Sequence, residues 1–480
     1  MIKKISITNL IKNHNSIAFI DQTGFIQSKD YADLVIKISN YLLATGIERG
    51  DRIAIFSENS YVFVLLILAL INIGAIAVPI NTYTPIPQLQ KLKKQVNIKK
   101  IFISRHYSQP DFNNKEYTEL EQIIENISLC EKQKNHYQTQ LNRDALIIFT
   151  SGSTGKPKVV LLTLGNLYYN ALGANVNIPF KKGERWLLTL PLYHIGGIGI
   201  IIRALISGGT VVIPDRRNSI ADHIKIYNVT HISLVSTQLY RLLNEEKAGN
   251  ILAKMKAILI GGGPIDADLV KQCIRYKIPL FTSYGSTEMA SQITTTSSDD
   301  RPTCWYTSGR VLQYRKIKIS KEGEILVKGK TLCKGYINNN RISLSLNDRG
   351  WFQSGDLGEI DIKGYLNVLG RKDNMFISGG ENIYPEEIEA NLLELPEIEN
   401  ALVVPVPEKE FGSVPFAFIK TREKQKINET QLQTSLKDKL AAFKIPKFYR
   451  TWPENYIGMK PDRNYFTRLA VQDMKLKSER

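Results

Sequence analysis

The sequence contains little cysteine and no paired cysteine motif. Its four cysteines, Cys130, Cys273, Cys304 and Cys333, lie far apart, and none forms a CxxC pair. This spacing argues against a disulfide framework and against a zinc site, and it fits the reducing conditions of the cytoplasm. Residues 1–15 also lack the apolar core of a signal peptide, so we expect no secretory leader there.

Internal repeats and low-complexity tracts are also missing from the sequence. Their absence argues against a repeat architecture. The chain has 480 residues, of which 43% are hydrophobic. That length and composition exclude a disorder-rich protein and suit two or three domains with full cores.

One hydrophobic run, residues 62–80, is long enough to be mistaken for a membrane span. Asn72, Gly74 and Pro79 interrupt the run, and residues 75–78 have the composition of a strand. The pattern therefore predicts a buried helix followed by a buried strand.

The net charge of +17 and the pI of about 9.4 raise the possibility of a nucleic-acid partner. However, the lysines are spread along the chain, no basic run interleaves with aromatic residues, and no zinc-finger or RNP-like pattern is present. We interpret the charge as a solvated surface that attracts anionic substrates, and we expect no nucleic-acid partner.

Helical and strand-like segments alternate over residues 1–140. Helical periodicity marks 31–46 and 84–96, and short apolar strands mark 52–56 and 100–104. This alternation predicts an α/β fold with a largely parallel sheet covered by helices.

The pattern changes from about residue 305 to short strands and turns. Residues 317–319, 324–328 and 365–369 alternate as antiparallel strands do. Two helices, 385–393 and 429–442, follow in a smaller α+β unit. We therefore predict a large N-terminal domain, 1–372, that includes a β-rich subdomain, and a small C-terminal domain, 373–480.

A segment rich in hydroxyl groups and glycine follows the predicted strand 145–149. Its residues are Thr150, Ser151, Gly152, Ser153, Thr154, Gly155, Lys156, Pro157 and Lys158. Glycine lets the backbone approach a bound group, and successive backbone N–H groups form an anion-binding concavity. The segment therefore predicts a polyphosphate site, with a flexible surface loop as the alternative. It is not a Walker A loop, because Pro157 stands where Ser or Thr is required.

Three further predicted strands also end in polar or glycine-rich segments. Strand 186–191 precedes Tyr193-His194, and a buried helix is predicted at 198–206. Strand 257–260 precedes Gly261-Gly262-Gly263, and strand 281–284 precedes Gly285-Ser286-Thr287-Glu288. Ligands of open α/β sheets bind beyond the carboxyl ends of the strands. We therefore expect these four strand ends to converge on one site.

The ordered series of motifs resembles the AMP-forming acyl-CoA synthetase family, also called the adenylate-forming or ANL superfamily. Together the matching segments cover nearly the whole chain, and all of them in order are highly specific. They are 150–158, 190–194, Tyr284-Gly285-Ser286-Thr287-Glu288, Trp351-Phe352-Gln353-Ser354-Gly355-Asp356, Gly370-Arg371-Lys372-Asp373 and 378–385.

The resemblance implies two half-reactions that use ATP, Mg²⁺ and CoA. A carboxylate attacks ATP to give an acyl-adenylate and pyrophosphate, and a thiol then displaces AMP. Backbone donors and cations are needed where negative charge develops, and Mg²⁺ would act as a Lewis acid on the phosphates. The resemblance also implies a mobile C-terminal domain that swings between the two steps.

Residue roles follow from the resemblance one position at a time. Thr150 to Lys156 correspond to the cradle of the β- and γ-phosphates, Thr287 to a contact of the α-phosphate, and Glu288 to the magnesium-linked carboxylate. Tyr284 corresponds to the residue that stacks on adenine, beside Gly261 to Gly263 and Gly285. Asp356 and Arg371 correspond to the ribose ligands. The alternatives without a function are that Asp356 forms an Asx turn and that Glu288 is a charge partner of a helix N-terminus.

The C-terminal part carries the family's catalytic lysine and its hinge. Lys460 stands in the region of that lysine, although Met459 separates it from Gly458 and Pro461 follows it. Lys444 and Lys447 are rival candidates. Asp373 corresponds to the hinge residue. The turn that would shape the CoA tunnel consists of Ser378, Gly379, Gly380 and Glu381, and an ordinary turn is its alternative reading.

Finer features resemble the branch of the family that acts on o-succinylbenzoate in menaquinone synthesis. These features lie in 234–243, 285–292 and 405–412. This acid has two carboxylates, so it needs a polar contact besides those at the reacting group. We predict that His194, Gln238, Arg241 and Ser291 bind the acid, with Arg241 able to supply charge. A core or capping histidine and a surface arginine are the alternatives.

Several other functions remain open at this point. The acid can instead be another aryl or medium-chain acid, or the acyl group can pass to an acidic carrier protein. A protein that only binds nucleic acid or a membrane surface has just the net charge in its favour. Whether the chain forms a homo-oligomer cannot be decided from its sequence.

Overall fold

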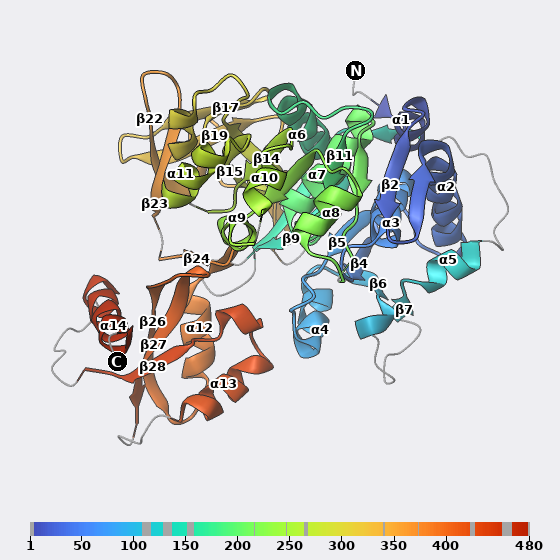
Figure 1. Cartoon of the computed structure of the whole chain (residues 1–480). Coiled ribbons are helices and arrows are strands. Elements are labelled where there is room, and N and C mark those ends of the chain that lie inside the picture. The colour runs from blue at the N-terminus through green and yellow to red at the C-terminus, as the bar shows by residue number, and fades with distance from the viewer. Residues whose placement is uncertain are drawn as a thin grey trace. The chain divides into compact units, whose positions relative to one another are not determined.

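The computed structural model describes residues 4–107, 117–127, 137–150, 158–215, 217–245, 247–263, 267–338, 341–372, 374–422, 428–453 and 463–478. The chain divides into two compact units. The larger consists of 1–82, 93–149 and 159–370, and the smaller of 83–92, 150–158 and 371–480. Figure 1 shows the elements of both units.

The apolar run in the N-terminal part forms a buried helix and a buried strand, as predicted. Helix α3 (Tyr61–Ile73) begins at Ser60, whose Oγ accepts a hydrogen bond from the Phe63 N–H, and it ends at Gly74, which has φ 83°. Strand β5 (Ile76–Pro79) follows and is buried throughout. Among the described helices, none has the length and apolar character that crossing a membrane requires.

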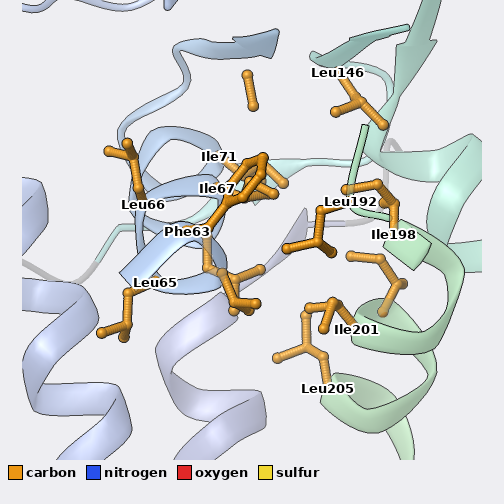
Figure 2. Close-up of a cluster of buried hydrophobic side chains, with 14 of the residues drawn as sticks. Phe63, Leu65, Leu66, Ile67, Ile71, Leu146, Leu192, Ile198, Ile201 and Leu205 are labelled. Atoms are coloured by element: carbon orange, nitrogen blue, oxygen red, sulfur yellow. The ribbon is translucent and has the colours of Figure 1, made fainter. Parts of the chain in front are cut away.

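The core of the larger unit forms where α3 packs near helix α7 (Ile195–Ser207). Figure 2 shows Phe63 and Ile67 of α3 facing Leu192, Ile198 and Ile201 across this core. All of these side chains are at most 9% exposed. Burying each one favours the folded state by about 1.5–3 kcal/mol, so this core stabilises the larger unit.

A nine-stranded sheet forms one layer of the larger unit. Its central strands are parallel, and antiparallel strands complete both edges. In spatial order they are β17 (Arg310–Val311), β16 (Ser291–Thr295), β15 (Leu280–Ser286), β14 (Ala257–Ile260), β13 (His231–Leu234), β11 (Arg185–Leu187), β12 (Thr210–Val212), β2 (Ile17–Asp21) and β3 (Gly24–Gln27).

An eight-stranded sheet forms a second layer. The strands that come before residue 120 in the sequence pair in parallel, whereas β20, near the opposite edge of the sheet, pairs in antiparallel register. In spatial order it contains β21 (Arg341–Ser343), β20 (Gly335–Asn338), β10 (Lys158–Thr163), β9 (Asp144–Thr150), β5, β4 (Arg52–Phe56), β6 (Ile98–Ile103) and β7 (Tyr117–Glu119). The two sheets confirm the predicted mixed, largely parallel α/β class.

The predicted β-rich part is a four-stranded sheet, in which the registers of β18, β19 and β22 are antiparallel. It consists of β18 (Arg315–Ile319), β19 (Glu324–Gly329), β22 (Phe352–Ile360) and β23 (Leu366–Arg371). Strands β1 (Lys4–Ile5) and β8 (Thr139–Gln140) form a separate pair. The other α-helices that begin before residue 370 are α1 (Ile7–Asn13), α2 (Ser28–Ala44), α4 (Ile86–Gln95), α5 (Gln122–Ile127), α6 (Leu164–Asn177), α8 (Ile220–Ile226), α9 (Ser236–Leu243), α10 (Ala248–Leu252) and α11 (Ala267–Tyr276).

The smaller unit has the predicted α+β composition. Strands β26 and β27 form a long antiparallel hairpin, and β28 adds a parallel edge. Its elements are β24 (Phe376–Ser378), β25 (Glu381–Ile383), α12 (Pro385–Leu393), β26 (Ile398–Glu408), β27 (Gly412–Thr421), α13 (Glu429–Lys437), β28 (Phe448–Thr451) and α14 (Arg463–Ser478).

Several predicted boundaries were wrong. Helix α7 begins at Ile195 rather than Ile198, because Gly197 packs against the Pro191 and Leu190 carbonyls, where any side chain would clash. Strand β11 ends at Leu187, and helix α13 ends at Lys437 instead of residue 442.

Candidate functional site

Strands β11, β14 and β15 bring three of the four predicted strand ends to one sheet. Strand β14 pairs with β13 and β15, and β13 pairs with β11, all in parallel register. Their carboxyl ends therefore lie along one edge of the nine-stranded sheet. The fourth end, Thr150, terminates β9 in the eight-stranded sheet, and its Oγ1 donates to the Lys158 carbonyl at 3.5 Å. Residues 151–157 lie outside the described residues.

Tyr284 and Asp356 meet although they lie 72 residues apart in the sequence. The Tyr284 hydroxyl donates to Asp356 Oδ2 at 2.6 Å. Asp356 is 8% exposed, and its N–H donates to Ser354 Oγ at 3.0 Å. Burial, followed by the Asp356 charge, raises the pKa of Tyr284 well above its usual value, and the Glu288 charge adds to the effect. The phenol therefore stays neutral and donates a hydrogen bond to Asp356.

The predicted glycines have different structural reasons for being glycine. A Cβ on Gly261 would lie 2.8 Å from Ser283 Oγ, and Gly262 has φ 83°, which favours glycine. Gly285 faces the Ser291 carbonyl across the hairpin between β15 and β16, and a Cβ there would clash with that carbonyl. Close backbone packing alone therefore accounts for Gly285.

The turn that carries Thr287 and Glu288 has a strained backbone. Both residues lie in the 3₁₀ turn η2 (Thr287–Met289), and Ala290 and Ser291 follow with φ 57° and 108°. Positive φ costs a non-glycine residue on the order of 1–3 kcal/mol and persists only where the surroundings impose it. Asn170 of α6 imposes it here, because its Nδ2 donates to the Met289 and Gln292 carbonyls at 3.1 Å each.

Glu288 has a neutral side-chain partner. Its Oε1 accepts a hydrogen bond from the Tyr336 hydroxyl at 2.7 Å. The described ranges contain no group of three or more His, Cys, Asp or Glu residues that could hold a metal ion.

His194 is the N-terminal cap residue of α7. Asn59 holds the segment before it, since Asn59 Nδ2 donates to the Leu190 carbonyl and Oδ1 accepts from the Leu192 N–H, both at 2.9 Å. One turn further along α7, a Cβ on Gly199 would lie 3.7 Å from Ser291 Oγ. Two of the predicted acid-binding residues thus lie beside α7: His194 caps its N-terminus, and Ser291 of β16 faces Gly199.

Arg203 of α7 is a buried cation that the sequence analysis missed. It is 3% exposed, donates to the Gln292 side chain and to the Ala174 and Ile178 carbonyls, and lies 4.4 Å from the centre of the Trp186 ring. Burial, followed by repulsion from Arg315, lowers its pKa to about 9. A single arginine inside the apolar helix 195–207 was the available signal.

Gln238 and Arg241 lie on helix α9, which follows β13. Gln238 Oε1 accepts from the Val235 N–H at 3.1 Å, so this oxygen already caps the helix. Arg241 is exposed. The structure thus brings neither side chain into a described contact with His194 or Ser291, and the acid-binding role of both stays a prediction.

Within the smaller unit, Ser378 to Glu381 form the tight turn between β24 and β25. Gly379 and Gly380 have φ 59° and 88°, and the Gly379 N–H donates to the Phe411 carbonyl at 2.9 Å. Lys444 forms a half-buried ion pair with Glu387 at 2.7 Å, which is a structural role. Lys460, Asp373 and the side chain of Arg371 lie outside the described residues.

Comparison with known proteins matches most of this chain to two family models. Residues 9–337 match the model of the AMP-binding enzyme, and residues 387–455 match the model of the AMP-binding enzyme C-terminal domain. The first match covers the residues that form the eight- and nine-stranded sheets. The second match covers most of the C-terminal α+β elements.

Curated relatives match over nearly their full length. A 2-succinylbenzoate–CoA ligase of Listeria monocytogenes is 32% identical over 422 residues, which are 87% of this chain and 88% of that protein. A protein with the same description from Bacillus thuringiensis is 32% identical over 438 residues, covering 88% and 89% of the two chains.

Solved structures match as well. The o-succinylbenzoate CoA synthetase (MenE) double mutant of Bacillus subtilis, bound to the product analogue OSB-NCoA, has a TM-score of 0.88 at 29% identity and covers 96% of this chain and 98% of its own. The Bacillus subtilis enzyme in complex with ATP and magnesium ion has a TM-score of 0.69 at 30% identity, with 94% and 96% covered.

Proposed function

We propose that this chain, which belongs to the AMP-binding enzyme family of adenylate-forming acyl-CoA ligases, joins o-succinylbenzoate to CoA with ATP as the energy source. The products would be o-succinylbenzoyl-CoA, AMP and pyrophosphate. The observation that carries the proposal is the meeting of Tyr284, Asp356 and Glu288 beside adjacent carboxyl ends of parallel strands. We place the enzyme in the cytoplasm and in menaquinone synthesis.

The proposed nucleotide site uses residues of several strand ends. Tyr284 stacks on adenine beside Gly261, Gly262 and Gly263. Asp356 accepts hydrogen bonds from the ribose hydroxyls, and Arg371 donates hydrogen bonds to them. The bond from Tyr284 supports this arrangement, because it fixes the orientation of the Asp356 carboxylate. Thr287 contacts the α-phosphate, and the segment Thr150 to Lys156 cradles the β- and γ-phosphates.

In the first step, a carboxylate oxygen of the acid attacks the α-phosphorus of ATP, and the bond to pyrophosphate breaks. The attacking and attacked groups are both anionic, so the site must supply donors before the charges meet. Thr287 and Lys460 are the groups that we assign to the developing charge on the α-phosphate. His194, at the start of α7, borders the entry of the acid.

Glu288 would hold the Mg²⁺ of the bound nucleotide, and the metal would supply Lewis acidity to the phosphate oxygens. The residues fit this ion, because Mg²⁺ is commonly bound by one or two carboxylates together with phosphate oxygens and water. The side-chain partner that the structure gives Glu288 is the neutral hydroxyl of Tyr336, which does not compete with a metal as a cation would.

In the second step, the sulfur of CoA attacks the acyl carbon, AMP leaves, and the thiol proton passes to solvent. We propose that the C-terminal domain, 373–480, turns about Asp373 between the two steps. The turn Ser378 to Glu381 would then line the pantetheine channel, since a turn with glycines at two positive φ values offers backbone to a narrow arm.

The acid assignment rests on the relatives together with the polar surroundings of Ser291. Ser291 lies beside Gly199, and the cation of Arg203 is bonded to the neighbouring residue Gln292. This buried positive charge favours an acid that carries a second carboxylate. Arg241 and Gln238 remain the candidates at the outer end of the pocket.

The test is AMP release in the presence of ATP, Mg²⁺, CoA and a panel of o-succinylbenzoate, substituted benzoates and fatty acids. The Glu288→Gln variant provides the matched inactive control. The proposal predicts a kcat/KM for o-succinylbenzoate at least about 100-fold above that for benzoate, because a buried charged contact is lost with the monoacid. Turnover with another acid, and none with o-succinylbenzoate, would support the ligase reaction but contradict o-succinylbenzoate as the substrate.

Transfer of the acyl group to a carrier protein is the second candidate. The net charge of +17 favours an acidic partner. Adenylate formation without turnover of CoA would support this acceptor and contradict CoA.

A further inference from the structure

The segment from Cys333 to Tyr336 contacts Glu288 at two points. The Cys333 N–H donates to the Glu288 carbonyl at 2.7 Å, and the Tyr336 hydroxyl donates to Glu288 Oε1 at 2.7 Å. One contact fixes the main chain of Glu288, and the other fixes its carboxylate. The side chain of Glu288 is therefore held in one orientation.

Tyr336 belongs to a different sheet from the turn that carries Glu288. It lies on β20 and pairs with Val160 of β10 in antiparallel register. Strand β10 begins at Lys158, which is the last residue of the segment rich in hydroxyl groups and glycine. Glu288, by contrast, follows β15 of the nine-stranded sheet. The hydroxyl of Tyr336 thus fixes the position of the Glu288 carboxylate relative to strand β10.

The chemistry of the partner suits a carboxylate that binds a cation. A phenol donates one hydrogen bond without neutralising the charge, whereas Lys or Arg at this place would compete with a metal for the carboxylate. Within the described ranges, the structure gives Glu288 Oε2 no hydrogen bond. One oxygen is fixed by Tyr336, and the second is the natural metal ligand.

We propose that Tyr336 is a positioning residue that aims Glu288 at the Mg²⁺ of bound Mg·ATP. This inference rests on the proposed function only in its need for a nucleotide and a metal, and it does not depend on which acid is used. Removing a residue that orients a metal ligand typically lowers metal affinity or activity by about 10- to 100-fold.

The test is Tyr336→Phe, which removes the hydroxyl and keeps the ring that lies 6.5 Å from Phe352. The readout is the increase in melting temperature caused by ATP, measured without any acid over a series of Mg²⁺ concentrations and in EDTA. We expect the Mg²⁺ concentration for half of the metal-dependent increase to rise about 10- to 100-fold. The increase with ATP in EDTA should stay unchanged.

The control is Tyr365→Phe, because the Tyr365 hydroxyl also donates to a carboxylate, that of Asp300. It should keep the wild-type Mg²⁺ dependence even if its melting temperature falls. In a Glu288→Gln background, Tyr336→Phe should cause no further change. An unchanged Mg²⁺ dependence in Tyr336→Phe, or an equal additional loss in the Glu288→Gln background, would overturn the positioning role.

The same experiment distinguishes a failure of the proposed function. Wild-type protein that gains no stability from Mg·ATP would contradict nucleotide binding, and the role of Tyr336 with it. A normal Mg²⁺ effect in the wild type, lost in Tyr336→Phe, supports the positioning role even if o-succinylbenzoate proves to be the wrong acid.

Discussion

The hydroxyl of Tyr284 donates a 2.6 Å hydrogen bond to Asp356 Oδ2, and this bond joins strand β15 of the nine-stranded sheet to strand β22 of the four-stranded sheet. It connects the residue assigned to adenine with the residue assigned to ribose. Each side chain thus sets the position of the other, so the two act as one unit in nucleotide binding.

Tyr284→Phe removes this bond and keeps the ring. A hydrogen bond to a charged group contributes about 1.5–3 kcal/mol, so we expect KM for ATP to rise about tenfold or more. The measurement is the acid-dependent exchange of ATP with pyrophosphate. KM for the acid should change little, because the lost contact orients Asp356 alone.

Coupling between the two residues can be measured with a double-mutant cycle. Asp356→Asn and Tyr284→Phe should together cost less than the sum of the single effects, because each removes the same bond. Additive losses would show that Tyr284 acts without Asp356.

Lys460→Ala should abolish adenylation and leave thioester formation from pre-made acyl-adenylate largely intact. The reason is that the lysine is assigned to the charge on the α-phosphate, which develops only in the first step. The control is Lys444→Ala, because Lys444 is engaged by Glu387 and its loss should lower stability without separating the two steps. Equal loss of both half-reactions in Lys460→Ala would contradict the assignment.

Local sequence patterns were sufficient to predict elements whose helix or strand character depends on neighbouring residues in the sequence. The apolar run of α3 and the buried strand that follows it are adjacent in sequence, and both were predicted. Helix α7 was predicted to begin too late, because Gly196 and Gly197 have low helix propensity. The packing of Gly197 against the Pro191 carbonyl overrides that propensity, and it depends on tertiary contacts.

The candidate site was predicted as separate motifs and not as contacts. Tyr284, Asp356 and Glu288 stand in recognisable segments, whereas Tyr336 is one of 22 tyrosines and nothing in its neighbourhood marks it. Asn170 and Arg203 lie in helices at positions that sequence alone assigns to the core. Their roles depend on which carbonyls they reach, and only the folded chain shows this.

Gly380→Leu should impair transfer to CoA and leave adenylation nearly unchanged. Gly380 has φ 88° in the turn between β24 and β25, so a leucine there would strain the turn and add bulk beside the proposed pantetheine channel. The readout is thioester formation from pre-made acyl-adenylate. Gly364→Leu, at φ 84° with open space around it, provides a control of similar strain, and an unaffected CoA step in Gly380→Leu would refute the channel role.

Arg241→Ala tests the outer end of the acid pocket. We expect KM for o-succinylbenzoate to rise about two- to fivefold, a modest effect because an exposed cation is screened by water. KM for benzoate should stay near the wild-type value, since benzoate lacks the second carboxylate. Lys225→Ala removes an exposed lysine from helix α8 and should change neither value. Equal increases for both acids in Arg241→Ala would remove Arg241 from the pocket.

His231 should make stability depend on pH. Its ring is buried and stacks on Trp186 at 5.0 Å, and its Nε2–H donates to the Pro179 carbonyl at 2.9 Å. Burial lowers the pKa of His231 to about 4, with Arg203 and Lys256 contributing and Glu184 opposing. In the unfolded chain the pKa is about 6.5, so the unfolded state binds the extra proton between these two values.

The sign of the effect follows from that difference. The contribution of His231 to stability is fully present above about pH 6.5 and is lost as the pH falls toward 4, with a total of at most about 3 kcal/mol. The measurement is the free energy of unfolding in urea at about pH 7.5 and pH 5. His231→Gln should be less stable at the higher pH and show a weaker decline, whereas His106→Gln, at an exposed histidine, should keep the wild-type decline. Identical declines in both variants would show that His231 does not carry the effect.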